Sequence, residues 1–218
     1  MAERIASSVA DTKAIFLDAL GTLVELEPPW VGLRAALGDG LPDDRLIGAV
    51  RAEMAYYKAH SHEGRDRESL ADLRGRCAQL LSRELGTEVS VETLVESIRF
   101  DPYPDVAPAL EQLGSRGLKL VCVSNWDCSL GTVLDRCGLA EHLDGAVSSA
   151  EAGARKPDPA IFTPALAIAG CAPQEAVHVG DTREEDLDGA RAAGIRALLI
   201  DREGGGDVAA LGEVAEKL

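Results

Sequence analysis

Short apolar runs alternate along the chain with segments whose apolar residues recur at helical spacing. The runs are rich in aliphatic and β-branched residues and cover 13–20, 119–125, 145–149, 176–181 and 196–201. Runs of this length and composition predict strands that are buried on both faces. Because they alternate with helical patterns, the sequence predicts an α/β fold with a parallel, Rossmann-like sheet.

A long helical stretch separates the first predicted strand from the second. Its apolar residues form three stripes at helical spacing, the last preceded by Ser90 as an N-cap: Leu46, Val50, Met54 and Tyr57; Leu70, Leu73, Cys77, Leu80 and Leu81; and Leu94, Val95 and Ile98. Such stripes need a partner to be buried, so we expect a helical bundle inserted after the first strand. The segment DPYPDV (101–106) is the expected hinge. The predicted organisation is an α/β core of residues 1–27 and 103–218 and an α-helical cap of residues 28–102.

The composition excludes several classes of function. The 218 residues carry a formal net charge of -15, which disfavours binding to a nucleic-acid phosphate backbone. No apolar run approaches the roughly 20 residues of a membrane span, and the N-terminus MAERIASSVADTK lacks the apolar stretch of a secretory signal. Five cysteines without CxxC spacing predict reduced thiols. We therefore expect a cytoplasmic protein without nucleic-acid or membrane partners, either a monomer or a homodimer.

Polar residues stand where three of the predicted strands end: Asp18, Ser124 and Asp181. In an open parallel sheet the carboxyl ends of the strands meet at one crevice, so these side chains are expected to face a common site. A carboxylate there can attack an electrophile and form a covalent intermediate. Two carboxylates also offer the hard oxygens that Mg²⁺ prefers.

Four segments resemble the motifs of the haloacid dehalogenase superfamily, in the order in which that family carries them. AIFLDALGTL (14–23) matches the nucleophile motif, VCVSN (121–125) the second, RKPDP (155–159) the third and HVGDTREED (178–186) the acidic fourth. The resemblance spans nearly the whole chain. It implies a hydrolase of the group that contains phosphatases, dehalogenases and phosphotransferases, with a helical cap inserted after the first strand.

The resemblance implies a role for each residue at a matching position. Asp18 is the expected nucleophile, and Lys156 is expected to neutralise its carboxylate and the anionic oxygens of the substrate. The expected Mg²⁺ ligands are Asp18, the backbone carbonyl of Leu20 and Asp181, with Asp186 as an outer-sphere group or helix cap. Glu184 and Glu185 are expected to be solvated.

The phosphate-binding groups are expected at two strand ends. Ser124 and Asn125 offer a hydroxyl and amide donors that suit a transferring phosphoryl oxygen, together with Lys156. Gly21 permits the turn after the first strand, and the hydroxyl of Thr22 is expected to hold Asp18 and to contribute to phosphate binding.

One position departs from the phosphatase pattern. Most phosphatases of this family carry a second Asp two residues after the nucleophile, where it acts as general acid and base; this chain has Leu20. Proton transfer contributes about 10²–10⁴-fold to a rate. The sequence therefore predicts a Mg²⁺-dependent hydrolase of a small phosphorylated metabolite that works through an aspartyl phosphate and is slow on poor leaving groups.

Two alternatives remain open from the sequence. Dehalogenation of a 2-haloacid needs no proton for the departing halide, although Asp181 places an acid where a carboxylate substrate would bind. The second alternative is a catalytically weak binding or regulatory module that keeps a phosphate pocket but has lost turnover.

Several further residues are candidates for packing or for substrate recognition. His178 lies within an apolar run and is expected to be a packed strand residue, whereas Cys128 lies in acidic surroundings that disfavour a thiolate nucleophile. The cap candidates for contact with the substrate are Trp30, Arg34, Tyr56, Tyr57, His60 and His62.

Overall fold

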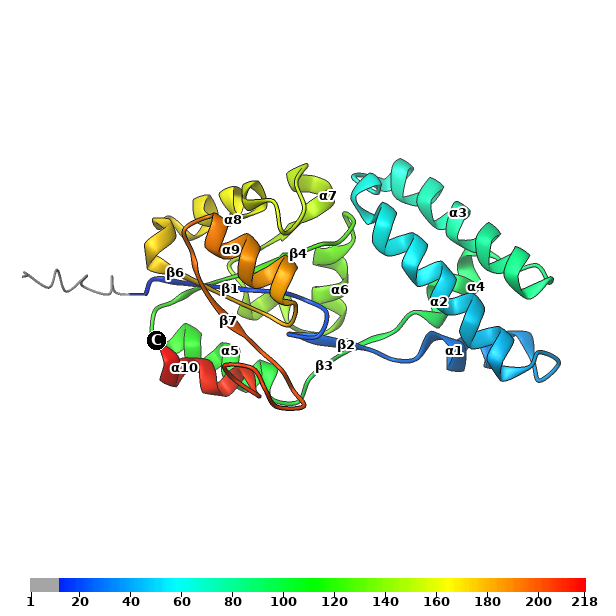
Figure 1. The fold of residues 1–218 in the computed structure, drawn as a ribbon, viewed down its shortest axis with the longest axis horizontal. Coiled ribbons are helices and arrows are strands. Elements are labelled where there is room, and N and C mark those ends of the chain that lie inside the picture. Colours follow the sequence, from blue (N-terminus) through cyan, green and yellow to red (C-terminus); the bar gives the residue numbers. More distant parts are fainter. Residues whose placement is uncertain (1–11) are drawn as a thin grey trace, which may run out of the picture.

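The core of the molecule is a five-stranded parallel sheet, seen in a computed structural model that describes residues 12–218 (Figure 1). Its strands follow one another across the sheet in the order β5 (Gly145–Ser148), β4 (Lys119–Ser124), β1 (Ala14–Leu17), β6 (Ala176–Gly180) and β7 (Arg196–Leu199). All five predicted strands and the α/β class are confirmed. Residues 1–11, with most of the N-terminal sequence considered above, lie outside the described part.

The central strand β1 shows why these runs are apolar without alternation. Ile15 and Leu17 belong to the hydrophobic cluster on one face of the sheet, and Ala14 and Phe16 to the cluster on the other. All four side chains are fully buried. Successive side chains of a strand point to opposite faces, so a strand covered on both sides must be apolar at every position.

Helices cover both faces of the sheet and make a three-layer core (Figure 1). One face is packed against α5 (Val106–Ser115), α6 (Leu130–Arg136) and α10 (Val214–Lys217). The other is packed against α8 (Phe162–Ala169) and α9 (Gly189–Ala192), and the short α7 (Ser149–Ala152) follows β5. This arrangement leaves the carboxyl ends of the strands open toward the cap.

The inserted cap is a bundle of the helices α1 (Pro29–Leu37), α2 (Asp43–His60), α3 (Arg67–Leu85) and α4 (Val91–Ser97). The last three correspond to the three predicted stripes, whereas α1 was not predicted. Ser90 caps α4 as expected, because its hydroxyl accepts a hydrogen bond from the Thr93 amide at 3.1 Å. The inward stripes form a separate hydrophobic cluster that contains Leu81 but not Leu80.

Two strands connect the cap with the core. β2 (Val24–Leu26) leaves the core and β3 (Phe100–Pro102) returns to it, and they pair antiparallel, side by side (Figure 1). The proline-containing return segment therefore begins within a strand of a two-stranded ribbon. Pro102 is accommodated because it stands at the end of a ribbon that has no third strand.

Two expectations from composition can be checked against the fold. All five cysteines are free thiols. Within residues 12–218, no helix has the combination of length and apolar character that crossing a membrane requires.

The cap cluster yields a test of the packing in α3. Leu81→Ala should lower the free energy of unfolding by about 2–5 kcal/mol, because Leu81 is fully buried and its truncation leaves a cavity. The same change at the neighbouring, less buried Leu80 is the matched control and should cost clearly less. Equal losses in urea-induced unfolding of the two variants would contradict the packing described here.

Candidate active site

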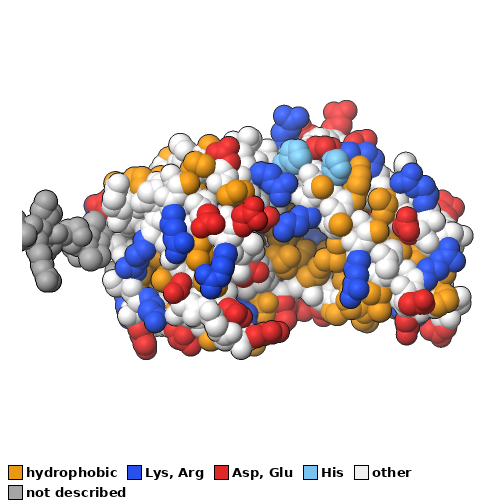
Figure 2. Space-filling view, viewed as in Figure 1, with side chains coloured by type: hydrophobic (Ala, Val, Ile, Leu, Met, Phe, Trp, Pro, Cys, Tyr) orange, Lys and Arg blue, Asp and Glu red, His pale blue; other side chains and the backbone are white. Residues whose placement is uncertain are grey.

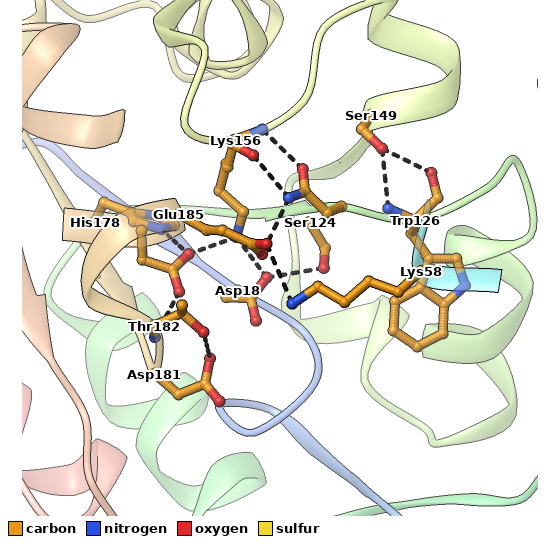
Figure 3. Close-up of polar contacts among 12 residues, drawn as sticks. Asp18, Lys58, Ser124, Trp126, Ser149, Lys156, His178, Asp181, Thr182 and Glu185 are labelled. Carbon is orange, nitrogen blue, oxygen red and sulfur yellow. Dashed lines mark hydrogen bonds and ion pairs between the residues drawn. The ribbon is translucent and has the colours of Figure 1, made fainter. Parts of the chain in front are cut away.

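The strand-end residues meet at the carboxyl edge of the sheet, as the topology predicts. Asp18 follows β1, Ser124 ends β4, and Asp181 follows β6 (Figure 3). The Oδ1 atom of Asp18 accepts hydrogen bonds from Ser124 Oγ at 2.8 Å and from Lys156 Nζ at 2.6 Å. No group of residues 12–218 donates a hydrogen bond to the second oxygen, Oδ2. The carboxylate is thus oriented through one oxygen and leaves the other free.

Lys156 is a buried cation between two carboxylates. Its Nζ lies 2.6 Å from Asp18 Oδ1 and 2.5 Å from Asp186 Oδ1, and its side chain is only 2% exposed. Burial disfavours the ammonium, but the two carboxylates outweigh that effect and raise the pKa of Lys156. Burial also raises the pKa of Asp18, against the opposing effect of Lys156. Lys156 therefore keeps its charge beside the candidate nucleophile.

Asp186 is the most extensively bonded acid of the site. Its Oδ1 contacts Lys156 Nζ and His178 Nε2, the latter at 2.9 Å, and its Oδ2 accepts a hydrogen bond from the Thr182 amide at 2.9 Å. Burial disfavours its ionised form, but Lys156 and His178 outweigh this and hold the pKa of Asp186 well below its usual range. Because protein groups occupy both oxygens, its assignment as an outer-sphere group gains support and stays a prediction.

His178 has the packed position expected of it. Its ring is fully buried on β6 and meets the ring of Phe162 edge-on at 5.0 Å between centroids. Burial lowers the pKa of His178, against the opposing effect of Asp186, and so favours the neutral ring. Its contact with Asp186 adds a positioning role that the sequence did not indicate.

The acids gather closely enough to hold a cation. One ligand atom each of Asp18, Asp181 and Asp186 lie within 4.8 Å of one another. Gly21, at φ +83°, is necessary for this approach, because a Cβ at that position would lie 2.2 Å from Asp181 Oδ2. None of the described residues donates a hydrogen bond to the Leu20 carbonyl. Asp18 Oδ2, Asp181 Oδ2 and the Leu20 carbonyl are hard oxygens to which no described group donates a hydrogen bond, and such oxygens fit Mg²⁺.

Asp181 differs from the other acids in its protonation. Asp181 is exposed as a residue, yet the protein packed around its carboxylate disfavours the charged form, and the nearby Asp18 adds repulsion. Together these effects raise the pKa of Asp181 to about 6. Its charge therefore depends on pH near neutrality.

The contacts of Asn125 and Thr22 with the rest of the protein were not those expected from the sequence. The Asn125 side chain accepts a hydrogen bond from the Lys156 amide at 2.8 Å and donates one to the Lys156 carbonyl at 3.0 Å, so it holds the third-motif loop. The expectation that Thr22 holds Asp18 is wrong: its hydroxyl is buried and forms no hydrogen bond within residues 12–218. Contact of Asn125 or Thr22 with phosphate stays a prediction.

The cap contributes residues that the sequence did not single out. Lys58, near the end of α2, extends into the site, where its Nζ lies 3.2 Å from Glu185 Oε1 (Figure 3). Glu185 also accepts a hydrogen bond from Asn125 at 3.2 Å, so the expectation that it is solvated is wrong. Periodicity alone does not show which residue of α2 faces the core, and a lysine on a helix gives no further signal.

A second contact joins cap and core, through a residue that was predicted as a candidate. The hydroxyl of Tyr57 donates a hydrogen bond to Asp127 Oδ2 at 2.7 Å. Asp127 follows the second motif by two residues and is buried. Nearby, burial raises the pKa of the Cys128 thiol, in agreement with the expectation that it is no nucleophile.

The other cap candidates form no hydrogen bond or ion pair with Asp18, Asp181 or Asp186 among the described residues. Trp30 packs against the hydrophobic cluster of the cap. Arg34, Tyr56 and His60 are engaged within the cap by Asp43, Arg76 and Glu63, and His62 lines a cleft between cap and core.

Comparison with known proteins indicates the family to which this chain belongs. A family model described as haloacid dehalogenase-like hydrolase matches residues 12–194. Haloacid dehalogenase-like hydrolase domain-containing protein 3 of Bos taurus is 46% identical over 85 residues, which are 39% of this chain and 34% of that protein. Phosphoserine phosphatase of Thermus thermophilus is 38% identical over 120 residues, which are 55% of this chain and 48% of that protein. The chain thus matches less than half the length of these relatives.

A solved structure extends the match to nearly the whole chain. The HAD phosphatase from Thermococcus onnurineus superimposes with a TM-score of 0.67 and 25% sequence identity, covering 94% of this chain and 97% of that one. The family model covers most of the sequence, and the solved structure has the same overall fold as this chain. The chain belongs to the haloacid dehalogenase-like hydrolases.

Proposed function

We propose that this hydrolase is a Mg²⁺-dependent phosphatase that transfers the phosphoryl group of a small phosphorylated metabolite to Asp18 and then to water. The observation that carries the proposal is the bonding of Asp18: Ser124 and Lys156 orient one oxygen, and the other is free to attack. The phosphatases among the relatives support the same reaction class.

The chemistry proceeds in two displacements. Asp18 Oδ2 attacks phosphorus, the bond to the leaving oxygen breaks, and an aspartyl phosphate forms. Water then attacks phosphorus, its proton goes to solvent, and inorganic phosphate leaves while the carboxylate is regenerated. Lys156 offsets the negative charge of the Asp18 carboxylate and of the phosphoryl oxygens. The hydroxyl of Ser124 donates a hydrogen bond to Asp18 Oδ1 and stabilises its charge.

The groups that would hold Mg²⁺ are Asp18, Asp181 and the carbonyl of Leu20. Asp186 would be an outer-sphere group. The ion supplies charge neutralisation for the phosphoryl group when bound. Lys156 by itself is insufficient, because two carboxylates already share its single charge.

Leu20 defines what the site lacks. Leu20 is 40% exposed on the turn that follows Asp18, and its aliphatic side chain cannot donate a proton to the leaving oxygen. We propose that the enzyme therefore acts well on leaving groups that depart without a proton, such as acyl and aryl phosphates, and slowly on alkyl esters.

The nucleophile is tested with Asp18→Asn. Release of phosphate from p-nitrophenyl phosphate and acetyl phosphate should fall by at least about 10³-fold, as expected when a nucleophile is removed. Asp188→Asn, at an exposed acid of the same region, is the control and should retain activity. Metal-independent release of chloride from 2-chloropropionate would instead support a dehalogenase, and inactivity of the wild-type protein in every assay would support a binding module.

Leu20→Asp tests the missing general acid. Turnover of an alkyl phosphate such as glycerol phosphate should rise by about tenfold or more, whereas turnover of p-nitrophenyl phosphate should change much less, because its leaving group needs no proton. Leu20→Asn has a similar size and polarity but cannot transfer the proton. An equal gain in the Asn variant would show that polarity, not proton transfer, limits the reaction.

Metal binding should depend on pH through Asp181. Its pKa of about 6 in the metal-free protein means that the carboxyl group is protonated at lower pH and must lose a proton to bind Mg²⁺. Calorimetric titration with Mg²⁺ should give an affinity that is constant well above pH 6 and falls as the pH drops through it. Asp181→Asn should bind weakly at every pH, and a persistent pH dependence in that variant would assign the effect to another group.

A further inference from the structure

The two lysines near Asp18 are already paired with carboxylates of the protein, so they offer little positive charge to a second anionic group of a substrate. Asp18 and Asp186 share the charge of Lys156, and Glu185 takes the ammonium of Lys58. Any anionic group of the substrate beyond the reacting phosphoryl must therefore find a cation elsewhere, because burying a charge without a partner is costly.

Such cations line a cleft between the cap and the core. The cleft has a volume of about 280 Å³, and its walls include Arg65 and His62 from the cap and Arg155 and Ser149 from the core. Figure 2 shows basic and histidine side chains gathered along the junction of the two lobes. In a chain with a net charge of -15, a basic cleft at this place contrasts with the rest of the molecule.

The arginines of the cleft are available to a ligand. Neither Arg65 nor Arg155 forms an ion pair with any carboxylate within residues 12–218. The acid on the cleft wall, Glu63, is already engaged by His60 at 2.8 Å and by Arg76 at 2.5 Å. A guanidinium presents a planar fork of donors that matches a carboxylate or phosphate in bidentate fashion.

Residues of the cleft wall are connected to the candidate catalytic groups through neighbouring residues and hydrogen bonds. Arg155 precedes Lys156, whose ammonium contacts Asp18, and the hydroxyl of Ser149 bonds to the amide of Trp126, next to Asn125. The Arg155 guanidinium donates a hydrogen bond to the backbone carbonyl of Lys58 at 3.4 Å. Lys58 thus touches the cleft wall through its backbone and the catalytic site through its side chain.

We infer that this cleft is a subsite for a second anionic group of the substrate, recognised by Arg155 of the core and Arg65 of the cap. The inference rests on the proposed phosphatase function and specifies its substrate class: small phosphorylated metabolites whose leaving group ends in a carboxylate or a second phosphate. Because one arginine comes from each lobe, the anion also links the cap to the core while the phosphoryl group is at Asp18.

The test compares pairs of phosphonates that cannot be hydrolysed. Calorimetric titration in the presence of Mg²⁺ measures the binding of carboxyalkylphosphonates of increasing length, from phosphonoacetate to phosphonobutyrate, and of alkylphosphonates with the same number of carbons. At least one carboxylate compound should bind the wild-type protein about tenfold or more tighter than its uncharged counterpart, as expected for a charge-assisted pair.

Arg155→Gln and Arg65→Gln should each reduce that preference to less than about threefold, while the affinity for the plain alkylphosphonate stays within about twofold. Arg67→Gln, an equivalent change at an exposed arginine two residues from Arg65 and outside the cleft, should leave the preference intact. Arg65→Gln keeps the test valid where the Arg155 variant fails to fold.

The outcomes separate the subsite from the phosphatase activity, because phosphonate binding is measured without turnover. Absence of a carboxylate preference at every length, or its retention in both arginine variants, overturns the subsite even where p-nitrophenyl phosphate is hydrolysed. A preference that both variants lose supports the subsite even where no phosphate is released.

Discussion

The site depends on one buried ammonium, that of Lys156, held between the carboxylates of Asp18 and Asp186. All three side chains are almost excluded from solvent. Removing one partner of such a group typically costs about 3–5 kcal/mol, because the remaining charge stays buried and uncompensated. The geometry of the third-motif loop, the end of β1 and the segment after β6 is therefore coupled through a single cation.

The surrounding contacts hold Lys156 and its partner Asp186 in position. Asn125 binds both backbone polar groups of Lys156, so the end of β4 fixes the loop that carries it. His178 and the Thr182 amide fix Asp186. At Gly180 a Cβ would lie 2.1 Å from the Asp186 carboxyl carbon, so the close approach of this acid to β6 requires a residue without a side chain. The donors around Asp18 are thus preorganised before any substrate arrives.

The cap acts on this preorganised centre from outside. It is joined to the core by the β2–β3 ribbon and touches the site through Tyr57 and Lys58, which are consecutive residues of α2. Lys58 is paired with Glu185, the residue that also bonds to Asn125, so the position of the cap and the second-motif loop are connected through one carboxylate.

The sheet, the inserted cap and the strand-end acids could all be predicted from the sequence, because they follow from local patterns. Apolar runs predict doubly covered strands, helical stripes predict a bundle, and the ends of parallel strands must meet. Leu20 could be recognised as a departure because its position is counted directly from Asp18. The tertiary structure alone decided the partners. That Glu185 lies between Lys58 and Asn125, and that Arg65 faces the same cleft as Arg155, both depend on the orientation of the cap over the core. This orientation is set by contacts between residues far apart in the chain, which no local periodicity records.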